Sequence, residues 1–173
     1  MLLQRDQALR FINGYKPVLL RVLENTGAPE SGSVNTDLSN ARALAKETPS
    51  LIEQALAELA SEGAQVEPAV AAAIRSVRVE TWIYLQHSKT YAVFLDKEAK
   101  NAYAVRALTT PLNQLLDEPP FALEAGVFEF EGVFVCDGLA LNPVALGPRY
   151  RSQLKAVYSL LRKSGHFHAR TAA

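Results

Sequence analysis

The sequence lacks several features that would each point to a particular class of protein. Cys136 is its only cysteine, so no disulfide forms within the chain, and a reducing compartment is expected. No stretch approaches the roughly 20 apolar residues of a membrane-spanning helix. The first residues, MLLQRDQALRF, lack the apolar run and cleavage site of a signal peptide. We therefore expect a soluble, cytoplasmic protein with no membrane partner.

Motifs of catalysis and cofactor binding are also missing. The chain has no phosphate-binding loop, dinucleotide fingerprint, catalytic triad pattern or zinc-ligand spacing. His166 and His168 lie near the end of the sequence without the further ligands that a closed metal site needs. The sequence therefore predicts no metal and no cofactor, and it gives little support for an enzyme.

The formal net charge is zero, so no overall field attracts the protein to nucleic acid or to an anionic membrane. The charges are unevenly distributed, however. Residues 138–173 contain six basic residues and no acid, whereas residues 96–137 contain eight acids and three basic residues. The basic end either pairs with this acidic segment or binds an external anionic partner.

What the chain does have is the composition of an ordinary globular protein. It has 173 residues, of which 49% are hydrophobic and 21% charged, enough to build one core. Between Val77 and Leu85 apolar side chains alternate along an extended chain, with Trp82 and Tyr84 on the face opposite Ile83 and Leu85. This alternation predicts a strand, and residues 91–95 predict a second strand across a short turn.

Further strands are expected at residues 102–108, 121–130 and 133–139, and helices at 37–46, 49–62, 68–74, 111–116 and 148–163. Because most connections between strands are short, we predict an α+β fold. Its five-stranded, mainly antiparallel sheet follows N-terminal helices and precedes a C-terminal helix packed on the sheet. The predicted organisation is a helical arm (1–25), a flexible linker (26–36), the α+β domain (37–165) and a tail (166–173).

The arm is expected to contain two short helices, because Asn13-Gly14 is typical of a helix end and Pro17 of a helix start. Aromatic side chains are expected on both faces of the sheet, and the helices cover only one of them. We therefore predict a homo-oligomer, formed through the arm or through the second sheet face.

One segment, ALAKETPSLIEQALAELASEGAQV from Ala43 to Val66, resembles the helix-turn-helix of winged-helix bacterial regulators. Leu56, Leu59 and Gly63 match the end of its recognition helix, which in that family is followed by a strand. The resemblance implies DNA binding. This helix, however, offers mainly acidic side chains, where a DNA-reading helix presents basic or amide ones, so nucleic acid is not our first expectation.

The main candidate site is the loop and helix start after Cys136. Cations in the first turn of a helix are disfavoured by its dipole unless a negative group offsets them, and Arg149 and Arg151 occupy such a turn. That group belongs either to this chain or to a bound anion. The candidate ligand-binding residues are Arg149, Arg151, Lys155, Tyr150 and Asn142.

We therefore predict a small binding or interaction module that recognises an anionic ligand or an acidic protein near the start of the C-terminal helix. The first alternative is the winged-helix-like regulator. The second is a hydrolase with a sheet-lined cleft, which uses either Cys136 as the nucleophile or a pair of acids that the sequence does not identify.

Overall fold

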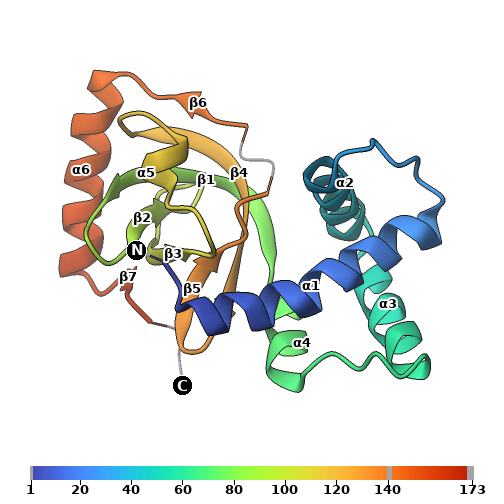
Figure 1. Cartoon of the computed structure of the whole chain (residues 1–173). Helices are drawn as coiled ribbons and strands as arrows, with labels where there is room; N and C mark the ends of the chain where they lie inside the picture. Colours follow the sequence, from blue (N-terminus) through green and yellow to red (C-terminus); the bar gives the residue numbers. More distant parts are fainter. Residues whose placement is uncertain (1, 140–141, 171–173) are drawn as a thin grey trace.

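The computed structural model describes residues 2–139 and 142–170, and it combines helices with a β-barrel (Figure 1). Four helices come first: α1 (Arg5–Thr26), α2 (Val34–Glu47), α3 (Ser50–Ser61) and α4 (Pro68–Arg75). The barrel strands are β1 (Arg78–His87), β2 (Ala92–Leu95), β3 (Ala102–Ala107), β4 (Phe121–Phe130) and β5 (Val133–Cys136). The remaining elements are α5 (Leu112–Leu115), β6 (Val144–Ala145), α6 (Pro148–Lys163) and β7 (Phe167–His168). The predicted α+β class is confirmed.

Four of the five neighbouring strand pairs are antiparallel, but the sheet is closed, which the sequence does not predict. Their order is β1-β2-β3-β5-β4, and β4 pairs again with β1, so the sheet closes into a five-stranded barrel. The β3–β5 pair is parallel. Closure is possible because β1 is long: it pairs with β4 over residues 78–84 and with β2 over residues 83–87. A five-stranded Greek-key barrel is the architecture of the OB-fold.

One set of the aromatic side chains that we predicted on the two faces of the sheet lies inside the barrel. Trp82 and Tyr84 are fully buried there and pack near Phe94, and the Trp82 Nε1–H donates a hydrogen bond to the Ala125 carbonyl at 3.1 Å. In an open sheet these rings would cover a second face. In a barrel they fill the core instead.

Helix α1 is continuous, so the prediction of two helices separated at Asn13-Gly14 is wrong. Its buried stripe passes through both halves and packs on α2, α3, α4 and the barrel, and this packing outweighs the helix-breaking effect of Pro17. Gly14 has a packing role: a Cβ there would lie 2.6 Å from Cγ1 of Val70 on α4. Phe11 stacks on Phe128 of β4 with ring centroids 4.0 Å apart. The predicted arm therefore lies against its own chain.

The segment predicted as a flexible linker, 26–36, contains the first turn of α2. Ahead of that turn, the Ser31 amide donates a hydrogen bond of 2.7 Å to the carboxylate of Asp37, which is buried. Two short strands also extend the barrel sheet, since β6 pairs with β4, and β7 lies in the predicted tail and pairs with β3.

Helix α6 covers another outer face of the barrel, on the side opposite α2 and α3 (Figure 1). Its buried residues are Leu154, Tyr158 and Leu161. They pack on a cluster from the first three strands, which consists of Leu85, Val93, Leu95 and Ala102. Both outer faces that carry apolar side chains are thus covered by helices of the same chain, and this removes the reason for expecting an open sheet face.

Within residues 2–139 and 142–170, no helix combines the length and the apolar character needed to cross a membrane.

Candidate functional site

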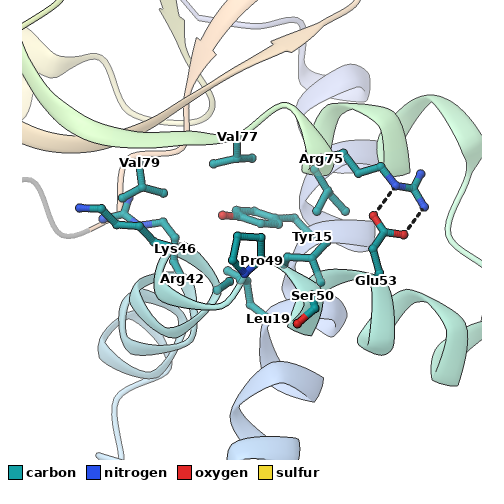
Figure 2. A pocket seen from close by; sticks show the side chains of 13 residues that line it. Tyr15, Leu19, Arg42, Lys46, Pro49, Ser50, Glu53, Arg75, Val77 and Val79 are labelled. Carbon is teal, nitrogen blue, oxygen red and sulfur yellow. Dashed lines mark hydrogen bonds and ion pairs between the residues drawn. The ribbon is translucent and has the colours of Figure 1, made fainter.

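A pocket of about 460 Å³ lies where the four N-terminal helices meet the beginning of β1 (Figure 2). Helices α2 and α3 are joined by only Thr48 and Pro49, so their adjoining ends stay close together beneath the strand. Because they are two residues apart in an extended chain, Val77 and Val79 lie on the same face of it, and they cover the pocket from above (Figure 2). The pocket is lined by Tyr15, Leu19, Arg42, Ala45, Lys46, Pro49, Ser50, Ile52, Glu53, Ile74, Arg75, Val77 and Val79.

A buried ion pair lies beside this pocket and links the helices to the barrel. Arg42 of α2 is 3% exposed, and its Nη1 donates to both carboxylate oxygens of Asp137 at 2.9 Å. The same carboxylate accepts hydrogen bonds from the amides of Gly126 at 3.2 Å and Leu139 at 3.1 Å. Burial raises the pKa of Asp137, and Arg42 is the main charge that opposes this rise.

The carboxylate also requires glycine at position 126, because a Cβ there would overlap it. The packing around Asp137 is therefore tight, and Arg42 is held at a fixed place in the pocket wall.

Arg42 keeps unused hydrogen-bonding capacity. Its Nε is buried and has no partner, and its Nη2 donates no hydrogen bond to any residue in the described ranges. The Tyr15 hydroxyl lies on the same side of the pocket and likewise bonds to none of those residues (Figure 2). Burial raises the pKa of Tyr15 well above its usual value, and the charge of Asp137 adds to the rise. The hydroxyl is therefore neutral and able to donate.

Two ion pairs lie at the rim. The Lys46 ammonium is 3.3 Å from the Glu124 carboxylate, and both side chains are exposed. Arg75 forms a two-point pair with Glu53, at 2.7 and 2.9 Å, on the opposite side of the pocket (Figure 2). Glu53, the one acid among the described residues that line the pocket, is thus already paired.

The site expected from the sequence lies elsewhere, at the start of α6. Arg149 and Tyr150 are exposed, and so is Asn142, which lies before the helix with a φ of 37°. Tyr150 is 56% exposed. The Arg151 guanidinium is 3.2 Å from Glu118, an intramolecular acid of the kind expected to offset it.

Only two of the five candidate residues come together. Arg151 and Lys155 line a small pocket of about 180 Å³ with Leu85, Gln86, His87, Glu118 and Pro119.

The helix-turn-helix resemblance holds only in part. Helices α2 and α3 are adjacent, but α3 is followed by α4, the helix predicted at 68–74, and not by the strand of the winged-helix pattern. The acids of α3 and its C-cap residue, Glu62, face neighbouring helices: Glu58 and Glu62 pair with Arg21 of α1, and Glu53 pairs with Arg75 of α4. Through these ion pairs the acidic face of α3 binds to α1 and α4.

Cys136, the candidate nucleophile, is 1% exposed in the barrel interior. Burial raises the pKa of its thiol to about 12, which disfavours the reactive thiolate. Across the described part of the chain, His, Cys, Asp and Glu side chains form no group of three or more that could hold a metal ion.

The barrel surface that OB-folds use most often for oligonucleotides and oligosaccharides is the face of β2 and β3. In this protein α6 covers that face through Leu154, Tyr158 and Leu161. The architecture alone therefore carries no functional conclusion.

Sequence reasoning did not identify Arg42. A signal for it was present, since Arg42 lies four residues after Leu38 and three before Ala45, on the apolar side of its own helix. A cation at such a position needs a buried partner. Asp137, which directly follows the apolar run of β5, is the corresponding acid.

Comparisons with known protein families, with curated proteins and with solved structures found no match to this chain.

Proposed function

We propose that this protein is a binding module that holds a small apolar ligand in the pocket between its helices and its barrel. The observation that carries the proposal is a pocket of about 460 Å³, walled mainly by aliphatic side chains, whose surface includes a buried arginine with an unpartnered N–H. Ligand sites typically combine such apolar walls with a few placed polar groups.

The proposal is tested by filling the pocket. Ala45→Phe places a ring among the lining residues, and Ala57→Phe makes the same change at an exposed position of α3 outside the pocket. The probe is 1-anilinonaphthalene-8-sulfonate, followed by its fluorescence. We expect saturable binding to the wild type and to Ala57→Phe, and loss of it in Ala45→Phe. Equal binding by all three folded proteins would contradict the proposal.

A second proposal keeps the start of α6 as a surface for an anionic ligand or an acidic protein segment. It is supported by Arg151, whose Nε is buried without a partner and whose ion pair is with a highly exposed acid, Glu118. We expect poly-glutamate to bind through charge, so that its binding weakens as salt is added. The binding should disappear when Arg149, Arg151 and Lys155 are all changed to Ala. Unchanged binding by this triple variant would exclude the site.

Self-association also stays a proposal. It is supported by large apolar side chains on the surface, among them Val144 at 63% and Leu160 at 65% exposure. Multi-angle light scattering gives the mass directly, and a value of 18.9 kDa would mean a monomer.

A cytoplasmic location is supported by the single, buried cysteine.

A further inference from the structure

The free edge of Arg42 defines the chemistry of the ligand. A guanidinium presents N–H groups on more than one edge, and two parallel N–H groups match the two oxygens of a carboxylate. Asp137 bonds only to Nη1 of Arg42. Within residues 2–139 and 142–170 the edge formed by Nε and Nη2 has no acceptor. Buried donors are nearly always satisfied, so Arg42 has donor capacity for an acceptor beyond Asp137.

The charges of the lining favour an anionic acceptor over a neutral one. Lys46 also lines the pocket, and because its ion pair with Glu124, at 3.3 Å, is exposed and weak, a ligand carboxylate can compete with Glu124 for the ammonium. Glu53 does not oppose an anion, because Arg75 holds its carboxylate at two points. The Tyr15 hydroxyl is available as a further donor on the same side (Figure 2).

The rest of the pocket restricts the remainder of the ligand. Apart from these polar groups, Ser50 and the Glu53–Arg75 pair at the rim, its walls are hydrocarbon. A second charge on the ligand would have no partner there and would lose its hydration. The ligand body is therefore apolar, and its polar group lies at one end.

We infer that the pocket binds a monocarboxylic acid with an apolar body, whose carboxylate contacts the Arg42 guanidinium and the Lys46 ammonium. This inference rests on the proposed function of the pocket. It adds the class of ligand and the residues that select it.

The test compares octanoate with octan-1-ol, which share a chain length and differ in the head group. Binding is measured from amide chemical shifts during titration. We expect octanoate to bind the wild type at least about tenfold more tightly than octan-1-ol, as a charge-assisted contact requires. The double variant Arg42→Gln/Asp137→Asn removes the guanidinium without leaving an unpaired buried charge, and it should lose this preference.

Lys46→Gln changes an exposed side chain and so keeps the test usable if the double variant does not fold. It should weaken octanoate binding about threefold and leave octan-1-ol unchanged. If both compounds bind the wild type equally, the carboxylate inference is overturned and the pocket proposal stands. If neither shifts the amides of the pocket residues, both are overturned.

Discussion

At the scale of single residues, the buried pair of Arg42 and Asp137 is the contact whose loss should matter most. Removing one partner leaves the other charged, buried and unpaired, which typically costs about 3–5 kcal/mol. We predict that Arg42→Gln lowers the free energy of unfolding by about that amount. The double variant Arg42→Gln/Asp137→Asn should lose less than the sum of its two single variants. Urea unfolding followed by the fluorescence of Trp82, the only tryptophan, measures each value.

The control is Arg75→Gln, which breaks an exposed two-point pair with Glu53. Exposed pairs contribute about 1 kcal/mol or less, so its effect should be small. Equal losses in the free energy of unfolding for Arg42→Gln and Arg75→Gln would show that burial does not increase the cost of breaking the Arg42–Asp137 pair.

The elements of the fold show which features are predictable from sequence. The bounds of β4 and α6 follow from local alternation and from helix start and stop signals, and the structure matches them. The closure of the barrel depends on pairs such as Arg78 with Val127, which no local pattern encodes. Gly14 illustrates the same limit: locally it is typical of a helix end, but its contact with Val70 of α4 gives it a different role.

The candidate site was harder to predict than the fold, for the same reason. Arg42 and Asp137 are far apart in the sequence, and each is an ordinary charged residue by itself. Only the packing of α2 against the end of β5 makes them a buried pair beside a pocket.

At the scale of elements, α1, α3 and α4 are tied together by carboxylates that should make the helices sensitive to acid. A hydrogen bond from Arg21 lowers the pKa of Glu62, and one from Asn25 lowers that of Glu58, while Arg10 has the same effect on Glu67. A carboxyl with a lowered pKa in the folded state stabilises that state above its unfolded pKa, near 4.5. This contribution is lost as the pH falls through the lower, folded value.

We therefore predict that the free energy of unfolding decreases below about pH 4.5, and that Glu58→Gln/Glu62→Gln makes this decrease smaller. Urea unfolding followed by circular dichroism at a series of pH values measures both. The control is Glu30→Gln, because Glu30 has no ion pair within the described ranges. An unchanged pH dependence in the double variant would contradict the prediction.

At the scale of the whole molecule, the barrel is enclosed between two coverings from its own chain. Phe11 of α1 packs on the side formed by Phe128 and Phe130, and α6 packs on the side formed by β1, β2 and β3. The covering by α6 is the smaller of the two, since only three of its residues are buried. Its contribution to stability is therefore open to a direct test on one helix.

Two neighbouring leucines of α6 provide that test. Leu161 is 9% exposed and packs on the barrel, whereas Leu160 is 65% exposed. Leu161→Asp would place a charge against Val93 and Leu95 and should cost at least about 3 kcal/mol. Leu160→Asp should change stability by about 0.5 kcal/mol or less. Hydrogen exchange shows which part of the barrel is exposed in the variant. If α6 detaches, the backbone amides of residues 92–95 should exchange before those of β4. Similar losses for both variants would mean that α6 does not cover the barrel through this face.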